Sequence, residues 1–257
     1  QQRLGTAAVH RAVSRLGRQP ARLQLQAHGV VDGVEPGGFL IGGMAGDALA
    51  LARCRFDGWD AAGAPEVWAL PQPDRAQAHP EDERAHQRQS ARDALRARLA
   101  AVFGVATEDI AISQKRGAAP RVSAHVGDST RWANVGLSIG HERGVSLIAW
   151  HGAGLVGVDV VRLAVHADAA ELARVAQLYL EPNRPSALVH QAQTAINTGA
   201  FLSHWACHEA RLKCAGLALV EWSDALATQL AGIHAVPVEL PPWAGDAAGA
   251  VAWRWCY

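Results

Sequence analysis

Apolar residues recur at spacings of three and four in three parts of this chain, and each part predicts a helix. The predicted helices cover about 83–103, 169–180 and 198–215. The apolar side of the first helix consists of Ala91, Leu95, Leu99 and Val102. Gly104 and Gly216 follow the first and third helices and are typical stop signals.

Short runs rich in β-branched and aromatic residues predict the strands. These runs lie at about 66–70, 110–113, 137–138, 145–150, 155–161, 219–222, 233–238 and 251–256. The run Leu155–Val161 is dense enough for a buried strand. The glycine-rich turn at 152–154 predicts that this strand forms a hairpin with the strand at 145–150. Helices and strands together predict an α+β fold.

The first 65 residues are expected to form an N-terminal extension outside the folded part of the chain. Residues 1–43 mix arginine with Gly-Gly pairs and show no sustained period, which is typical of disorder. Met44 is the only methionine. Two interpretations therefore stand: residues 1–43 are a truncated extension, or they precede the true start at Met44.

Composition excludes several classes of protein. The 257 residues, about half of them hydrophobic, suffice for one domain or two small ones. A formal net charge of zero argues against attraction to nucleic acid or membrane. The chain has no apolar run of membrane-spanning length and no signal-peptide pattern. Its four cysteines form no CxxC pair or zinc spacing, so we expect a reducing cytoplasm.

Lysine is rare here, because all but two of the 24 basic residues are arginine. The second lysine, Lys213, lies four residues after Glu209, so the two side chains are neighbours on a helix. Glu209 also shares a helical stripe with three apolar residues, Leu202, Trp205 and Leu212. One interpretation is a surface Glu–Lys pair. The other is a functional site, since an unpaired carboxylate in line with the core is costly.

Asp159 is the only charged residue in the run Leu155–Val161. A buried carboxylate needs a partner, so it either caps a loop at the strand's end or ligates a hard cation such as Mg²⁺. Gly157 would let a ligand approach the backbone closely.

Four arginines recur every fourth residue on the first predicted helix: Arg84, Arg88, Arg92 and Arg96. They form either a solvated face or an anion-binding surface for phosphates. A nucleic-acid binder is disfavoured by the zero net charge and by the lack of a groove-reading motif. The pair His204 and His208 lacks the glutamate of a zinc-hydrolase HExxH motif.

Two short motifs together resemble the 4′-phosphopantetheinyl transferases of the surfactin-synthetase-activating type. Gly157-Val158-Asp159 is followed, about 45 residues later, by the segment Trp205–Lys213 with sequence WACHEARLK. The family pattern is (V/I)G(I/V)D, a gap of roughly 40–45 residues, and (F/W)(S/C/T)xKE(A/S)xxK. The resemblance covers about residues 66–222 and leaves the first 60 residues outside.

The resemblance implies a fold and a reaction. The fold would be a pseudo-twofold pair of similar subdomains, 66–155 and 156–257, each a small mainly antiparallel sheet with helices, with a coenzyme A cleft between them. Such enzymes transfer 4′-phosphopantetheine from coenzyme A to a serine of an apo acyl or peptidyl carrier protein, and release 3′,5′-ADP. The reaction requires Mg²⁺, and we expect a monomer.

The resemblance also implies residue roles. Asp159 and Glu209 would hold Mg²⁺ on the pyrophosphate, and Glu209 would take the serine proton. Lys213 would steady the pyrophosphate charge. His141 matches a residue that contacts the 3′-phosphate. The remaining coenzyme A contacts would be Arg88 and Arg92 on the first predicted helix, with Lys115 or Arg116 in place of a family lysine.

The chain departs from the family pattern at the metal site. Many members have a second acid two residues after the aspartate, where this chain has Val161. Glu142 or a water would then complete the metal shell. Gly140 also replaces a serine, and His208 replaces a frequent lysine. These departures leave open a catalytically silent homologue that binds carrier protein or coenzyme A without transfer.

Overall fold

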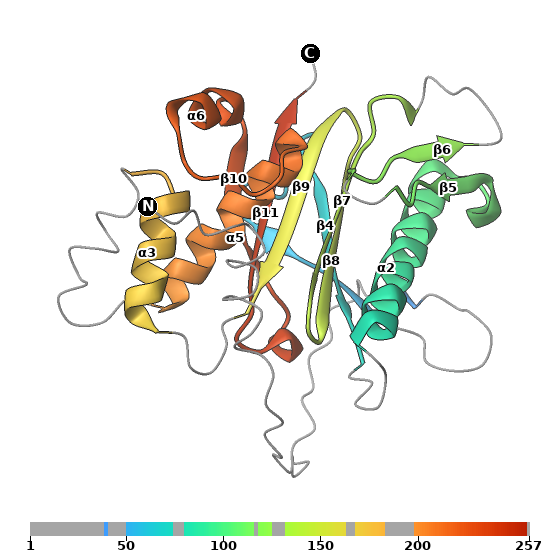
Figure 1. The fold of residues 1–257 in the computed structure, drawn as a ribbon. Coiled ribbons are helices and arrows are strands. Elements are labelled where there is room, and N and C mark those ends of the chain that lie inside the picture. The colour runs from blue at the N-terminus through green and yellow to red at the C-terminus, as the bar shows by residue number, and fades with distance from the viewer. Residues whose placement is uncertain are drawn as a thin grey trace, which may run out of the picture.

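Two antiparallel sheets lie at the centre of the protein and share an apolar cluster between them (Figure 1). The computed structural model describes residues 39–40, 50–73, 80–115, 118–124, 132–162, 168–182 and 198–255. Over these residues the expected α+β class is confirmed. No helix in these ranges is long and apolar enough to cross a membrane.

The first sheet has five strands in the order β1-β2-β4-β8-β7. Their bounds are Phe39–Leu40, Ala50–Arg53, Glu66–Pro71, Val145–His151 and Gly136–Glu142. The second sheet has four strands in the order β3-β10-β11-β9. Their bounds are Arg55–Phe56, His234–Glu239, Ala248–Trp255 and Gly154–Val161. A separate pair joins β5 (Ile110–Ile112) to β6 (Val122–Ala124).

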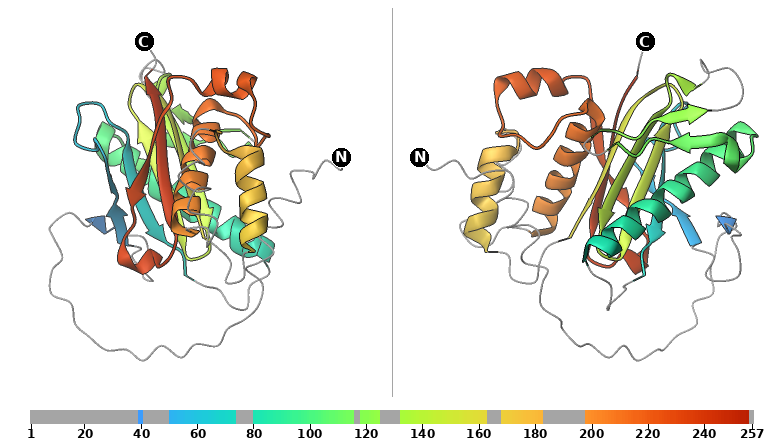
Figure 2. Two further views of the ribbon diagram at one scale, coloured as in Figure 1. Left: turned by 90° about the vertical axis from the view of Figure 1, so that its left-hand side faces the viewer. Right: turned by 45° about the vertical axis from the view of Figure 1, so that its right-hand side comes forward.

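Helices cover the outer face of each sheet (Figure 2). Helix α2 (Pro80–Phe103) packs on the first sheet, where Leu95 and Leu99 are fully buried. Each such leucine contributes roughly 1.5–3 kcal/mol through burial. The second sheet carries the other three helices: α3 (Ala169–Tyr179), α5 (Thr198–Ala215) and α6 (Asp224–Leu230). Two 3-10 turns complete the described elements, η1 (Thr107–Asp109) and η3 (Pro242–Ala244).

The long predicted helices are confirmed, but one position on α2 was wrong. Three of the four residues expected on its apolar side are fully buried: Ala91, Leu95 and Leu99. The fourth, Val102, is 42% exposed, because the buried row Ala91, Leu95 and Leu99 continues at a spacing of four to Phe103, which packs against the same cluster in place of Val102.

The predicted hairpin across residues 152–154 was wrong. Strand β8 pairs with β7 and β4, whereas β9 pairs with β11 in the other sheet. The turn therefore carries the chain between the sheets. The true hairpin joins β7 to β8, with Glu142 opposite Val145 and a two-residue turn at Arg143 and Gly144. Gly144 has φ of 80°, which suits glycine in such a turn.

Residues 39–40, 50–53 and 55–56 form strands of the two sheets, although the sequence grouped them with the extension. Strand β2 pairs with β4, and β3 pairs with β10 in the second sheet. The second sheet thus includes β3, which precedes residue 66, and β9, which begins at Gly154. Neither strand lies wholly within the predicted second subdomain, 156–257. The expectations for residues 1–38 and 41–49, including a start at Met44, lie outside the described residues.

The stretch at 219–222 is not a strand, contrary to the prediction. It links α5 to α6, and the Trp222 backbone N–H donates to the Leu178 carbonyl at 2.8 Å. Helix α6 was not predicted. It is only seven residues long and begins at Ser223, whose hydroxyl accepts from the Leu226 N–H at 3.2 Å.

The two sheets meet where their edge strands β7 and β9 lie side by side. Small residues at alternate positions of β7 face β9. A Cβ atom at Gly136 would lie 2.1 Å from the Gly154 carbonyl oxygen, and one at Gly140 would lie 3.2 Å from the Asp159 Cα. Between them, the Ser138 hydroxyl accepts from the Val158 N–H at 2.9 Å. This contact satisfies a backbone donor on the edge of β9.

Candidate functional site

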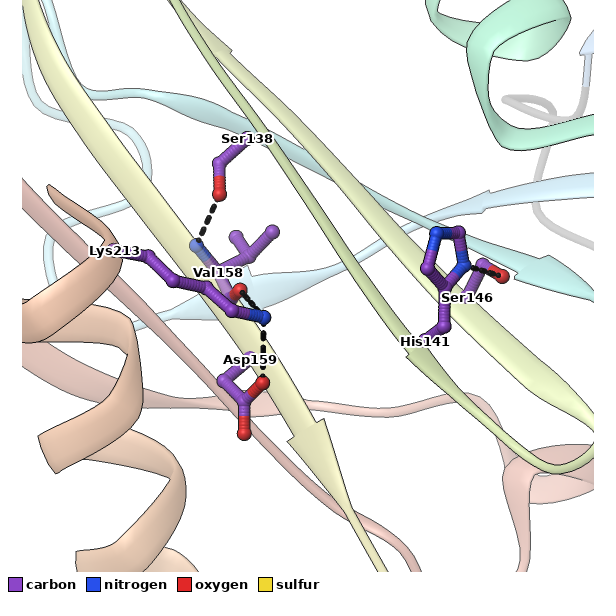
Figure 3. Close-up of polar contacts among 6 residues, drawn as sticks. All are labelled: Ser138, His141, Ser146, Val158, Asp159 and Lys213. Carbon is purple, nitrogen blue, oxygen red and sulfur yellow. Dashed lines mark hydrogen bonds and ion pairs between the residues drawn. The ribbon is translucent and has the colours of Figure 1, made fainter. Parts of the chain in front are cut away.

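An ion pair links the two motifs. The Lys213 ammonium on α5 donates to Asp159 Oδ1 on β9 at 2.7 Å, and to the Val158 carbonyl at 3.1 Å (Figure 3). The Asp159 side chain is 8% exposed. Lys213 therefore does not form the surface Glu–Lys pair considered from the sequence. Asp159 does not cap a loop either, since it pairs within β9 opposite Ala250.

Glu209 lies one helical turn before Lys213 and is partly buried. Burial and then the Asp159 charge raise the pKa of Glu209 to about 8, against the opposing effect of the Lys213 ammonium. For Lys213, burial lowers the pKa, but the Asp159 charge and hydrogen bond and the Glu209 charge outweigh it, so the net shift is upward. Two carboxylates thus share one ammonium, and the fully ionised trio carries a net negative charge.

Gly157 explains how α5 reaches β9. A Cβ atom at this position would lie 2.1 Å from the Ala210 carbonyl oxygen and 2.5 Å from the Cys214 backbone nitrogen. Only glycine lets the helix backbone rest on the strand here. The expectation that a ligand approaches Gly157 was therefore wrong, because the helix that carries Glu209 and Lys213 fills that space.

We expect Gly157→Ala to lower the melting temperature by about 2–12 °C. Overpacking typically costs about 1–3 kcal/mol, and each kcal/mol shifts Tm by about 2–4 °C for a domain of this size. Gly152→Ala is the matched control, since a Cβ there would lie 3.5 Å from the Trp150 ring, an ordinary contact. Thermal melts of both variants decide the matter. Equal melting of the two would show that α5 does not need the glycine.

His141 is held by a buried polar chain. The Gln72 amide donates to the Ser146 hydroxyl at 2.9 Å, and the same hydroxyl lies 2.9 Å from His141 Nδ1 (Figure 3). Burial and then the charges of Lys213, Arg88 and Arg92 together lower the pKa of His141 to about 4. The ring is therefore neutral at pH 7 and has three cations near it.

The sequence missed Ser146 and Gln72 as parts of the site. Ser146 is fully buried in a strand that is otherwise apolar up to its last residue, His151, and it pairs directly opposite His141. The two-residue turn at Arg143 and Gly144 was the signal that could have revealed this pairing. Gln72 follows the end of β4, and no sequence pattern pointed to it.

The four arginines of α2 differ in their surroundings. Arg88 and Arg92 are the ones whose charges lower the pKa of His141. Arg84 and Arg88 are both exposed, and Arg96 pairs with Asp93 at 3.2 Å. The assignment of Arg88 and Arg92 to coenzyme A remains a prediction.

Glu142 lies at the end of β7, near Asp159. Burial raises the pKa of its carboxyl, hydrogen bonds from the Arg143 and Arg162 backbones and the Arg162 charge lower it, and the Asp159 charge raises it. The Arg143 N–H donates to Glu142 Oε1 at 2.7 Å. Among the residues described here, no three His, Cys, Asp or Glu side chains gather closely enough to hold a metal ion. Glu142 as a third ligand remains a prediction.

The remaining predicted contacts are less well placed. Lys115 is exposed in the loop between β5 and β6, and Arg116 lies outside the described residues.

His208 is buried, and burial and then the Arg211 charge lower its pKa to about 4. It lines a cavity of about 10 Å³ beside Leu180 and Trp222, which is room for about one water. None of Asp159, Glu209 and Lys213 lines that cavity.

Two carboxylates suit Mg²⁺, which proteins often bind through one or two carboxylates plus substrate phosphates. Asp159 and Glu209 fit this role because both carboxyl groups are largely removed from solvent and lie near each other. The Lys213 ammonium can neutralise only one of their two negative charges. A scan against protein-family models gives no match for this chain, and a search of curated proteins also gives none.

The raised pKa of Glu209 predicts how stability depends on pH. Its carboxyl has a higher pKa folded, about 8, than its ordinary value of 4.5. Its contribution to stability is therefore fully present below pH 4.5 and is lost as the pH rises through about 8. Glu209→Gln stays neutral. Without divalent cations, its Tm advantage over the wild type should grow by at least about 2–4 °C between pH 5 and pH 9. A constant difference in thermal melts would contradict the burial of this carboxyl.

Proposed function

We propose that this protein transfers 4′-phosphopantetheine from coenzyme A to a serine of an apo acyl or peptidyl carrier protein. The reaction depends on Mg²⁺ and releases 3′,5′-ADP. The observation that carries the proposal is the meeting of Asp159 with Lys213 across 54 residues of sequence, with Glu209 beside them. These are the residue types that phosphoryl transfer needs for charge neutralisation and for activation of a hydroxyl.

In the proposed reaction the serine oxygen attacks the phosphorus next to the pantetheine. The bond from that phosphorus to the bridging oxygen breaks, and the electron pair leaves with 3′,5′-ADP. Glu209 accepts the serine proton, for which a pKa near neutrality is suited. Lys213 stabilises the charge that grows on the leaving phosphate. Mg²⁺, when held by Asp159 and Glu209, supplies neutralisation of the pyrophosphate charge.

The basic residues around His141 support binding of the other phosphates. Arg88 and Arg92 lie near His141, as does Lys213. A neutral histidine fixed through Nδ1 by Ser146 has its other ring nitrogen to offer to a phosphate. We assign the 3′-phosphate of coenzyme A to His141 and the two arginines. Lys115 and Arg116 remain proposed additional contacts.

We expect Arg88→Gln and Arg92→Gln each to weaken binding of coenzyme A by roughly 10–100-fold. Losing a charge-assisted hydrogen bond costs about 1.5–3 kcal/mol. Arg84→Gln is the control, because Arg84 lies on the same helix and is exposed like Arg88, but it is not among the charges that lower the pKa of His141. Calorimetric titration with coenzyme A measures all three. Equal, small effects at the three positions would favour a solvated row of arginines.

The proposal includes a pseudo-twofold arrangement with a coenzyme A cleft. What supports it is that each sheet carries one long helix on its outer face, α2 or α5, and that the edge strands β7 and β9 meet. The proposed cleft lies beside this junction, between His141 and Asp159. We further propose Glu142 as a third metal-side oxygen, and a monomeric enzyme of the cytoplasm.

A catalytically silent homologue is the second candidate function, and Val161 favours it, because a buried apolar side chain stands where many family members have an acid. The test is to incubate an apo carrier protein with the protein, Mg²⁺ and coenzyme A, and to weigh the carrier by mass spectrometry. A mass gain of one phosphopantetheine supports the transferase. Binding of coenzyme A without a mass gain supports the silent homologue.

A further inference from the structure

The Lys213 ammonium already occupies the oxygens next to the proposed cation site. It donates to Asp159 Oδ1 and to the Val158 carbonyl, both on the edge of β9 (Figure 3). The Asp159 side chain is almost fully buried, whereas the Lys213 side chain is 35% exposed. The lysine can therefore leave by rotating its flexible stem, while the carboxylate stays fixed in the strand.

We propose that Lys213 acts as an internal cation that competes with the divalent ion for Asp159, and that a pyrophosphate ligand removes this competition by drawing Lys213 to itself. Metal and ligand then bind cooperatively. This inference rests on the proposed function for the identity of the cation and of the ligand.

The charges on the surrounding elements make this exchange plausible in physical terms. Asp159 lies in contact with Lys213, and the carboxyls of Glu209 and Glu142 lie near enough to act on Asp159 or be acted on by it, so each adds negative charge to the site when it is ionised. Lys213 is the cation in direct contact with Asp159. Two cations that share one carboxylate repel each other strongly at low dielectric. A divalent ion therefore binds Asp159 well only when the ammonium has another anion to pair with.

A pyrophosphate is such an anion. By linkage, a ligand that pulls Lys213 from Asp159 must tighten metal binding by the same factor by which the metal tightens ligand binding. The charges of Arg88, Arg92 and Lys213 all act on His141, so a ligand held beside that ring would lie within reach of Lys213. Lys213 thus pairs with Asp159 in the ligand-free protein and with the pyrophosphate when metal and ligand are bound.

The first test measures Mn²⁺ binding to the full chain by electron paramagnetic resonance, without coenzyme A. Lys213→Met should bind Mn²⁺ at least about tenfold more tightly than the wild type, because the competing ammonium is gone. Arg211→Met is the matched control. It removes a cation from the same helix, but that cation pairs with Glu181 at 3.5 Å. Equal affinity in all three proteins, or weaker binding by Lys213→Met, overturns the proposal.

The second test adds saturating coenzyme A. In the wild type the ligand should tighten Mn²⁺ binding, and in Lys213→Met the tightening should be smaller, because part of it comes from releasing Lys213. The same tightening in both proteins overturns the proposed exchange.

The third test uses the wild type, so it does not depend on the variant folding. The chain has only two lysines, Lys115 and Lys213, and lysine-selective ¹³C labelling therefore gives two side-chain sets of NMR signals. Mg²⁺ with coenzyme A should shift the Lys213 signals well beyond the change seen with Mg²⁺ alone. A Lys213 signal that stays fixed under both conditions overturns the proposal.

These tests are independent of transfer. If the carrier gains mass but Lys213→Met does not bind Mn²⁺ more tightly, the internal-cation proposal is wrong and the proposed function stands. If the competition is observed and no carrier is modified, the cation site is supported and the transferase is not.

Discussion

Replacing Glu209 with glutamine is expected to lower the transfer rate at least roughly 100-fold while leaving the protein folded. The amide keeps the size of the side chain but cannot accept the serine proton, and general-base catalysis is typically worth about 10²–10⁴-fold. It also removes one of the two carboxylates proposed for Mg²⁺. The neutral amide suits the site, because burial already raises the pKa of the native carboxyl to about 8.

The rate is measured as carrier mass gain over time, with thermal melts alongside. Glu221→Gln is the control, since Glu221 is exposed in the link between α5 and α6. A Glu209→Gln enzyme that turns over near the wild-type rate would remove Glu209 from the mechanism.

Replacing Lys213 with methionine should also lower transfer at least roughly 100-fold, because the leaving phosphate loses its charge partner. Unlike the glutamine variant, it should melt at a lower temperature at pH 7. Asp159 would be left buried without its 2.7 Å partner, and removing one member of a buried pair is destabilising. The partial exposure of Lys213 reduces this cost through solvent screening.

Added Mg²⁺ should recover part of the lost Tm of Lys213→Met, because the ion can replace the ammonium beside Asp159. Arg211→Met serves again as the control. It should retain transfer and gain no more Tm from Mg²⁺ than the wild type. Unchanged transfer in Lys213→Met would contradict the role given to this residue.

The sequence predicted the elements that carry the site more accurately than the way they meet. Helix α5 and strand β9 were expected nearly within their observed bounds, because strong helical spacing and a dense β-branched run are local signals. The contact between Lys213 and Asp159 was not predicted. This contact forms because α5 lies directly on β9. Gly157 allows the helix backbone to approach the strand that closely, and a local sequence pattern does not reveal such an approach.

Strand partners were the hardest feature to predict. A tight glycine turn after β8 looks the same whether the next strand joins the same sheet or crosses to another, so the expected hairpin with β9 was wrong. The short strands β2 and β3 were missed for a similar reason. They have two to four residues each, too few for a period, and they are strands because β4 and β10 offer them free edges.

The polar chain behind His141 shows the same limit. Its members come from β4, β7 and β8, and a buried hydroxyl such as Ser146 carries no sign of function until its partner across the hairpin is known. Register, not residue type, makes it part of the site.

We propose that this protein attaches phosphopantetheine to a carrier serine through the site formed by Asp159, Glu209 and Lys213. The most direct measurement is peptide mapping by mass spectrometry of an apo carrier protein, after incubation with coenzyme A, Mg²⁺ and either the wild type or Glu209→Gln. We predict phosphopantetheine on the carrier serine and an equal amount of 3′,5′-ADP with the wild type, and neither with the variant in the same time. Coenzyme A that is bound but left intact by the wild type, with every carrier serine unmodified, would contradict the claim.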